Sequence, residues 1–292
     1  HPPVLFDPDH RAASANPAAL VKPRLDLQDK PAARFFLSSY LYALDAYREA
    51  ILHRGVTHLP RDAREAERLA RLAAQDPLGP GHLRWTGDRL EIDSALVIDP
   101  EAARARFLEG TVPTARRIGR LSEVDGPVIL AGGYGVRTLL EDSGFRFARG
   151  QLSWANGTLD RPVTYGGYAV PMGGRLLLGA THDRIEDPAA AFDLRPDDDA
   201  RNREQALSHG LDVGPGATSG RASVRVNSPD TLPRLFRFAH EKTGQDVWVL
   251  SGLGSRGFVF APLLGEALVS HYLGEPSPLS DPVREAFSRR PG

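Results

Sequence analysis

Two stretches of the chain place apolar residues at helical spacing, with charged residues between them. Over residues 31–53, Phe36, Tyr40 and Leu44 fall on one stripe. Over residues 64–75 (REAERLARLAAQ), leucines and alanines occupy one face and the charges occupy the other. The pattern predicts an amphipathic helix in each stretch, and the Pro- and Gly-containing sequence that follows ends the second.

A third helix is marked by its capping residues. In IDPEAARARFLEG, Asp99 suits the N-cap, Pro100 suits the first helical position, and Glu101 suits the positive end of the helix dipole. Gly110 is typical of the region just past the end of a helix. A helix is therefore predicted to begin at Pro100.

Short, continuously apolar runs predict buried strands. Residues 4–6 (VLF) form one run, which ends on Asp7. Residues 128–130 (VIL) form another, which leads into the glycine-rich sequence AGGYG and a short helix over residues 136–141. Residues 146–180 contain several short β-type segments separated by Gly, Pro and Asn turns. Residues 146–180 are therefore predicted to form a separate, mostly antiparallel layer.

The last third of the chain returns to mixed structure. A helix is predicted over residues 195–207 and a strand over residues 222–228. Residues 246–274 then form a strand, a glycine turn and a helix closed by Gly274. Strands that lead into glycine turns are thus interrupted by a mostly β insertion. This order predicts an α/β (α+β) fold: a Rossmann-like nucleotide-binding domain with a second sheet that faces the substrate.

Composition narrows the class of protein. The 292 residues are 41% hydrophobic, and 36 basic side chains nearly balance 37 acidic ones to give a net charge of -1. With so small a net charge, the protein has no overall electrostatic field that would attract DNA or an acidic membrane surface. The absence of cysteine excludes disulfides, thiolate metal sites and a cysteinyl-flavin link. No apolar stretch reaches the roughly 20 residues of a membrane helix, so a soluble, cytoplasmic protein is expected.

The most specific chemical pattern is SGLGSRGFVFAPLLGEAL. It follows an apolar strand at residues 247–250, and Gly252, Gly254 and Gly257 allow a tight turn and a close backbone approach to a ligand. The positive end of the following helix suits an anion or an electron-rich ring. A plain strand-to-helix connection is the alternative interpretation.

Other chemistries lack their patterns. The nine histidines show no metal-ligand spacing, so no metal site is predicted, and no nucleophile elbow or phosphate loop of the G-K-[ST] type occurs. The acidic run Asp197–Asp199 is interpreted as a helix N-terminus facing solvent. His182 is interpreted as structural.

Six motifs in order carry a family resemblance. They are ASANPAALVKPRL, VILAGGYGVRTLL, RGQLSWA, GGYAVP followed by LLLGATHDR, RASVRVNSPDTLPR and SGLGSRGFVFAPLLGEAL. Together they resemble the FAD-dependent D-amino-acid-oxidase-like (DAO) family over nearly the whole chain. Within this family the chain is most similar to the oxidoreductase domain of bacterial bifunctional enzymes that modify the wobble uridine of tRNA.

The resemblance implies FAD as cofactor and assigns residues to it. Asp7 matches the acidic residue that binds the adenosine ribose, although a turn Asp before Pro8 is the alternative. Asn16 before Pro17 fits a turn equally well, and Arg256 either adds positive charge near the flavin or faces solvent. The implied cofactor-binding residues are Asp7, Ser14, Asn16, Ala131, Gly132, Gly133, Gly252, Gly254, Ser255, Arg256 and Gly257.

The resemblance also assigns catalytic residues. Arg225 matches an arginine that grips the substrate carboxylate, for which a planar fork is suited; a surface strand arginine is the alternative. Gln151 lies in a strand that enters the substrate layer near the flavin ring, and it is the second residue assigned to catalysis. The implied reaction is hydride transfer to the flavin from the carbon next to an amine. The implied substrate is the carboxymethylaminomethyl group of wobble uridine, with a free amino acid such as glycine as the alternative.

The chain also departs from the family pattern. The G-x-G-x-x-G turn of the first βα unit is absent, so an inactive remnant that no longer binds FAD is a third interpretation. A methyltransferase domain, which such relatives often carry, is the implied partner. The FAD-binding domain is predicted over residues 1–30, 95–147 and 221–292, and the substrate domain over residues 31–94 and 148–220.

Overall fold

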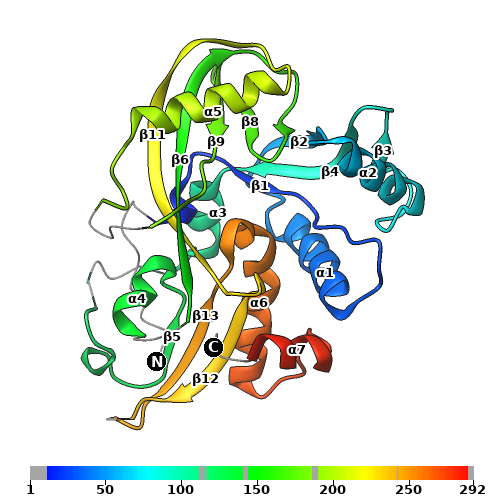
Figure 1. Ribbon diagram of the computed structural model, residues 1–292. Coiled ribbons are helices and arrows are strands. Elements are labelled where there is room, and N and C mark those ends of the chain that lie inside the picture. Colours follow the sequence, from blue (N-terminus) through cyan, green and yellow to red (C-terminus); the bar gives the residue numbers. More distant parts are fainter. Residues whose placement is uncertain are drawn as a thin grey trace.

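The chain folds around a large and a small β-sheet, with helices between and beside them (Figure 1). The predicted strand over residues 4–6, and Asp7, lie outside the part of the chain that this computed structural model describes. The described part comprises residues 12–111, 116, 118–140, 144–185, 190–241 and 243–288.

The large sheet has ten strands in the described part of the chain, in the order β1-β4-β2-β7-β8-β9-β6-β10, with β3 paired to β4 and β11 paired to β6. Its pairs are antiparallel except for β2 and β7. This sheet confirms the predicted antiparallel layer over residues 146–180. Its strands are β1 (Ala19–Val21), β2 (Ile51–His58), β3 (Leu83–Trp85), β4 (Leu90–Ile98), β6 (Arg146–Gly157), β7 (Val163–Thr164), β8 (Tyr168–Met172), β9 (Arg175–Gly179), β10 (Asp183–Arg184) and β11 (Val213–Asn227).

The small sheet orders β12 (Arg234–Ala239), β13 (Asp246–Ser251) and β5 (Val128–Leu130). β13 and β5 are parallel, so both end at the same edge of the sheet. Each then enters a glycine turn and a helix. The two strand–turn–helix predictions are therefore confirmed, and both turns lie where parallel sheets hold ligands.

The described helices follow the predicted order. In α3 the Asp99 carboxylate accepts from the backbone N–H groups of Glu101 and Ala102, so the predicted N-cap is confirmed. Gly274 ends α6 in the left-handed conformation, as predicted. The helices are α1 (Pro31–Ala46), α2 (Ala63–Gln75), α3 (Pro100–Phe107), α4 (Val136–Leu139), α5 (Pro196–Ser208), α6 (Gly257–Leu273) and α7 (Asp281–Ser288), with short 3-10 turns η1 (Ala13–Ala15), η2 (Leu121–Glu123), η3 (Gly133–Gly135) and η4 (Gly254–Arg256).

Aromatic rings join α1 to the helices of the small sheet. Phe35 lies 4.5 Å from Phe287 of α7, centroid to centroid, and Phe36 stacks on Phe260 of α6 at 5.6 Å. All four side chains are buried in one core cluster. Burial of large rings is the main stabilising contribution here, about 1.5–3 kcal/mol for each such side chain.

The prediction of one helix over residues 31–53 was wrong at its C-terminal end. α1 stops at Ala46, and residues from Ile51 onward form β2, which pairs with β4. Ile51 falls on the apolar stripe of the helix, yet its β-branched side chain also suits a strand. The pairing of β2 along the whole of β4 decides in favour of the strand over the helix, and that pairing is not visible in the local sequence.

The packing also differs from the predicted domain boundaries. α1, expected in the substrate domain, packs on α6 and α7 beside the small sheet. Residues 221–227, expected in the FAD-binding domain, continue β11 and pair with β6. β1 likewise joins the large sheet through β4.

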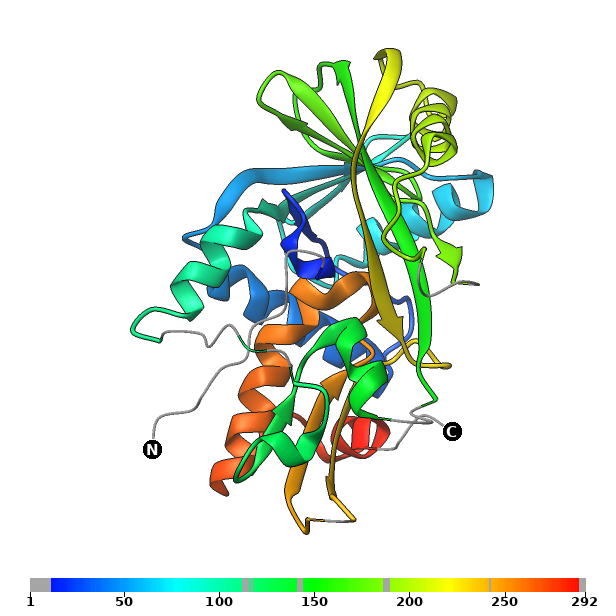
Figure 2. The same cartoon turned by 90° about the vertical axis from the view of Figure 1, so that its left-hand side faces the viewer.

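The long β6–β11 ribbon links the two halves of the molecule. The two strands stay paired to the end, where Asn227 lies opposite Arg146 (Figure 2). At that end Val226 enters the same core cluster as Val128 and Val247 of the small sheet. The ribbon thereby fixes the position of side chains on β11 relative to the glycine turns of the small sheet.

Candidate functional site

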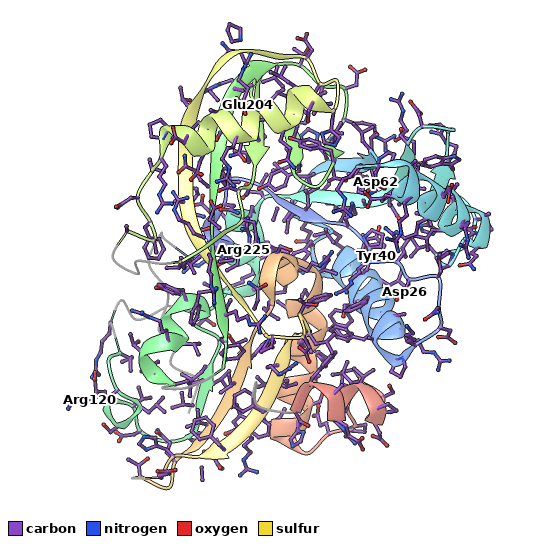
Figure 3. The ribbon with its side chains drawn as sticks, viewed as in Figure 1. Asp26, Tyr40, Asp62, Arg120, Glu204 and Arg225 are labelled. Atoms are coloured by element: carbon purple, nitrogen blue, oxygen red, sulfur yellow. The ribbon has the colours of Figure 1, made fainter. Side chains whose placement is uncertain are left out.

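A cavity of about 2570 Å³ opens between the glycine turns of the small sheet and the large sheet. In Figure 2 the dark-blue η1 lies above the orange N-terminal end of α6, and residues of both line the cavity. Figure 3 labels Arg225 on β11, which also contributes to the lining. Segments far apart in the sequence therefore meet at this one site.

The turn between β13 and α6 forms one wall of the cavity. Gly252 and Gly254 have φ values of 71° and 58°, which side chains with a Cβ rarely adopt. α6 then begins at Gly257, so its N-terminal N–H groups face the cavity. Gly252, Gly254, Ser255, Arg256 and Gly257 all line the cavity.

Replacing Gly252 by alanine is expected to destabilise this turn by about 1–3 kcal/mol, because a Cβ would be held at positive φ. The added atom would also lie 2.5 Å from Ser228 Oγ. The matched control is Gly265→Ala on α6, where a Cβ would meet nothing within 4 Å and a gain of about 0.4–1 kcal/mol is expected. Urea unfolding of both variants checks this, and equal stabilities would contradict it.

The other predicted cofactor residues lie around the same cavity. Ser14, Asn16, Ala131, Gly132 and Gly133 all line it. Asn16 Oδ1 accepts a hydrogen bond from Arg221 of β11, so the Asn16 side chain ties η1 to the large sheet. Asp7 lies outside the described residues.

Arg225 reaches the cavity because β6 has a glycine beneath it. A Cβ on Gly150 would lie 2.3 Å from Arg225 Nη1. The guanidinium donates to the Thr181 carbonyl oxygen at 3.2 Å, and no carboxylate pairs with it in the described part of the chain. Burial lowers the pKa of Arg225, and the nearby Tyr168 opposes this effect.

Arg256 is a second cation at the cavity, where its side chain is exposed to the open space. Partial desolvation by the cavity walls, followed by repulsion from Arg24, lowers the pKa of its guanidinium. Within the described ranges it too has no carboxylate partner. Two cations without a carboxylate partner in the described ranges therefore line one cavity, and their charge favours anionic ligands.

Gln151 does not reach the cavity, so the structure gives no support to its assignment to catalysis. Side chains alternate along a strand, and Gln151 points to the face that α5 covers, together with Arg149. It is fully buried, its amide donates to Arg195 O at 2.8 Å and Asp199 Oδ1 at 2.9 Å, and its carbonyl accepts from Arg149 Nη2 at 2.8 Å.

The acidic run forms the first turn of α5, as predicted, and Asp197 is exposed, but the interpretation as solvent-facing was wrong for the other two residues. Asp198 and Asp199 are 2% and 6% exposed, and they face the large sheet from α5. Asp198 pairs with Arg149, and Asp199 accepts from Ser153 Oγ at 2.6 Å. The run therefore anchors a helix, because these partners compensate the buried charges.

Replacing Gln151 by alanine is expected to lower the free energy of unfolding by about 2–3 kcal/mol, because several buried polar groups lose their partner. Its effect on KM is expected to be small, since the side chain lies away from the cavity. The control is Gln75→Ala at the exposed end of α2, which is expected to change neither quantity. A loss of kcat without loss of stability would restore the catalytic assignment.

Several cavity residues were missed by the reasoning from sequence. Lys22, His58, Thr164 and Tyr168 line the cavity, and so does His182, which was interpreted as structural. Burial, followed by the charge of Arg225, lowers the pKa of His182. The one signal available in the sequence was Lys22, which follows the predicted flavin segment and is one of three lysines in the chain.

The residues present fit a large anionic cofactor. A Cβ on Gly133 would meet nothing within 4 Å, so the turn after β5 leaves space on its cavity side. The Ser251 hydroxyl lines the cavity, is buried, and has no hydrogen-bond partner among the described residues. Together with Arg256 and the N-terminus of α6, these groups offer donors to a ligand.

The fold is that of known amine oxidases. Glycine oxidase from Geobacillus kaustophilus superposes with a TM-score of 0.73 at 17% identity, covering 99% of this chain and 92% of that one. Iminodiacetate oxidase from Chelativorans sp. BNC1 superposes with a TM-score of 0.70 at 21% identity, covering 97% and 91%. At these identities the two superpositions establish the fold of the chain, a large and a small sheet with the cavity between them.

Sequence comparison defines the family. Residues 90–271 match the DAO family, described as FAD dependent oxidoreductase. The proteins named tRNA 5-methylaminomethyl-2-thiouridine biosynthesis bifunctional protein MnmC from Caulobacter sp. (strain K31) and Caulobacter vibrioides are 35% and 37% identical, over 96% and 94% of this chain. The chain belongs to the DAO family of FAD-dependent oxidoreductases, and FAD is its cofactor.

Further observations concern the share of its relatives' length that this chain covers, its helices and its potential metal ligands. The chain spans about half the length of the Caulobacter relatives, 52% and 51%. Among the described helices, none has both the length and the apolar character that crossing a membrane requires. The described residues also contain no group of three or more His, Cys, Asp or Glu side chains able to hold a metal ion.

Proposed function

We propose that the protein oxidises a secondary amine bearing a carboxymethyl group, namely the carboxymethylaminomethyl group of the tRNA wobble uridine. The observation that carries this proposal is Arg225, a half-buried cation that lines the cavity without a carboxylate partner among the described residues. A substrate carboxylate would supply that partner. The bound carboxylate would then fix the orientation of the neighbouring C–H bond.

The relatives support tRNA as the substrate carrier. Proteins at 34–37% identity over at least 94% of this chain bear the name of the tRNA modification, whereas the glycine oxidase is 17% identical. Their name also says that they are bifunctional. We therefore propose a methyltransferase domain, or a methyltransferase protein, as the partner that acts on the amine product.

We propose that the predicted cofactor residues hold FAD around this cavity. Gly252, Gly254, Ser255, Arg256 and Gly257 would face the flavin pyrimidine ring, where the N-terminus of α6 favours negative charge. Ser14 and Asn16 would lie beside the flavin, and the turn Ala131–Gly133 beside the adenine or diphosphate end. FAD, when bound, supplies the oxidising equivalent for the reaction.

A free small amine is the second candidate substrate. Two of the fold neighbours are named for glycine and iminodiacetate, and iminodiacetate is itself a secondary amine with carboxymethyl arms. Arg225 would bind either kind of carboxylate equally well. The two candidates therefore differ in what is attached to the nitrogen, and the substrate has to be tested directly.

The test supplies the FAD-loaded protein with tRNA whose wobble uridine carries the carboxymethylaminomethyl group, and in parallel with glycine and with iminodiacetate. The expected result is conversion of the wobble nucleoside to its aminomethyl form, measured by mass spectrometry of digested tRNA, with release of glyoxylate. Oxidation of the free amines with unchanged tRNA would favour the second candidate. A protein that holds no FAD after desalting would contradict both.

A further inference from the structure

Lys22 is an unusual residue in this chain. Only three of the 36 basic residues are lysines, and the others are arginines. Lys22 directly follows β1 and lines the cavity, whereas Lys30 at the start of α1 is exposed. Arginine cannot lose its proton in a protein, but a buried lysine can. The chain thus has a titratable amine at a position where arginine would carry a permanent charge.

The Lys22 amine lies in a hydrogen-bonded group of side chains. Its Nζ is 2.9 Å from His58 Nδ1 and 3.0 Å from Thr164 Oγ1, and those two atoms are 2.7 Å apart. On the far side of the imidazole ring, His58 Nε2 is 3.6 Å from Glu65 Oε1. Glu65 in turn accepts from the exposed Arg61 at 2.8 Å. A chain of polar groups therefore runs from the cavity toward its rim.

The same group lies next to the residue proposed to bind the substrate carboxylate. Thr164 of β7 is paired with Tyr168 of β8, so their side chains share a face of the sheet. Tyr168 interacts electrostatically with Arg225. Lys22, Thr164, Tyr168 and Arg225 all line the cavity, and Tyr168 connects the group around Lys22 to Arg225.

Charges from several elements act on Lys22. Burial contributes most and, with Arg256 of the turn between β13 and α6, lowers the pKa of Lys22 to about 7. Arg68 of α2 and Arg61, which precedes that helix, act in the same direction, and Glu65 opposes them. The ammonium form of Lys22 therefore gives way to the neutral amine as the pH rises through about 7.

His58 stays neutral in this group. Burial, followed by the charge of Lys22, lowers the pKa of His58 to about 3, so its unprotonated Nδ1 accepts hydrogen bonds. Burial raises the pKa of Glu65, yet hydrogen bonds from Arg61 outweigh this effect and hold it near 2. Glu65 is thus a carboxylate that can stabilise a proton passing along the group.

Building on the proposed amine oxidation, we propose that Lys22 is the base that accepts the ammonium proton of the bound substrate, and that Thr164, His58 and Glu65 connect it to solvent. A protonated amine has no lone pair and cannot form the C=N bond of the product. The Lys22 lone pair takes one N–H proton, which leaves a neutral substrate amine and a Lys22 ammonium. The lone pair of the neutral substrate amine is then available to form the C=N bond. The α-carbon hydride would leave with both electrons, and FAD, when bound, would accept it.

The first test measures Lys22 directly, without turnover. Protein carrying ¹³C-labelled lysine has three ε-carbon signals, because the chain has three lysines. In the FAD-loaded protein one signal is expected to titrate near pH 7 and to disappear in Lys22→Met. The control Lys30→Met is expected to remove one of the other two signals and to leave the Lys22 signal in place. A Lys22 signal that titrates near 10 would overturn the proposal while leaving the proposed function intact.

The second test uses the carboxylated amine that the wild type oxidises. Lys22→Met is expected to lower kcat/KM about a hundredfold or more at pH 7 and to remove the rise in kcat/KM through pH 7. Lys22→Arg keeps the charge but cannot accept a proton, so it is expected to be equally slow. Full activity in Lys22→Arg would mean that Lys22 only binds an anion.

Two controls distinguish the loss of a catalytic base from misfolding or loss of FAD. Retained FAD absorbance and an unchanged unfolding midpoint in Lys22→Met show that the variant is folded and loaded. Added ethylamine is expected to restore part of the activity of Lys22→Ala, because a free amine can replace the missing base; no restoration in a folded, loaded variant contradicts the proposal. If the wild type oxidises no carboxylated amine, the proposed function fails, and this step fails with it.

Discussion

Replacing Arg225 by methionine is expected to lower kcat/KM for the carboxylated amine about a hundredfold to a thousandfold. Removing one partner of a buried charge pair costs about 3–4 kcal/mol, and each 1.36 kcal/mol corresponds to about a tenfold change in rate. The guanidinium also orients the substrate, so both KM and kcat are expected to change. Steady-state kinetics with tRNA or the free amine measures the effect.

The comparison variants sharpen this test. Arg225→Lys keeps the charge but loses the planar fork, so only part of the activity is expected to return. Arg84→Met, at an exposed position on β3, is the matched control and is expected to leave kcat/KM unchanged. An amine without a carboxylate should be oxidised equally slowly by the wild type and by Arg225→Met. If Arg225→Met lowered the rates for both kinds of amine equally, Arg225 would not be the carboxylate ligand.

Replacing Arg149 by methionine is expected to lower the free energy of unfolding by about 3–5 kcal/mol, the usual cost of breaking a buried ion pair. The side chains of Arg149 and Asp198 are only 2% and 3% exposed, and they pair beneath α5. Arg149 also donates to Gln151 Oε1 at 2.8 Å and to the Asp193 carbonyl oxygen. Its loss therefore leaves the Asp198 carboxylate without its buried partner and the Asp193 carbonyl oxygen without the Arg149 donor.

The control for this prediction shares the same carboxylate. Arg201 also pairs with Asp198, at 3.1 Å, but its own side chain is 53% exposed. Arg201→Met is therefore expected to cost less than about 1 kcal/mol. Urea unfolding of both variants provides the measurement. Similar losses in the two variants would mean that burial does not set the strength of this pair.

The stability predictions for Gln151 and Arg149 and the kinetic prediction for Arg225 concern opposite faces of the same ribbon. Arg149 and Gln151 point toward α5, whereas Arg225 lies across Gly150 on the other face. Variants on the α5 face are expected to unfold more easily with little change in KM. Variants on the cavity face are expected to change kinetics with little change in stability. These two sets of variants would therefore distinguish residues that stabilise the fold from residues that bind the substrate, although both sets lie within a few positions on the ribbon.

Local sequence was sufficient to predict structure wherever a residue acts on the backbone conformation of its own or neighbouring positions. Asp99 caps α3, Gly274 ends α6, and the glycines after β13 turn the chain, because each effect depends on conformation within one or two turns. The strand–turn–helix units were predictable for the same reason. The six ordered motifs then indicated the DAO family, which the comparison confirmed.

Tertiary structure alone decided which side chains meet. Alternation along β6 puts Gln151 and Gly150 on opposite faces, but the sequence does not say which face α5 covers. Lys22, His58 and Thr164 come from three separate segments. They meet because β1 and β2 both pair with β4, and β2 also pairs in parallel with β7. The sequence by itself thus determined the elements, the glycine turns and the family. The buried charge network and the amine beside the cavity depend on long-range strand pairing, which no local pattern encodes.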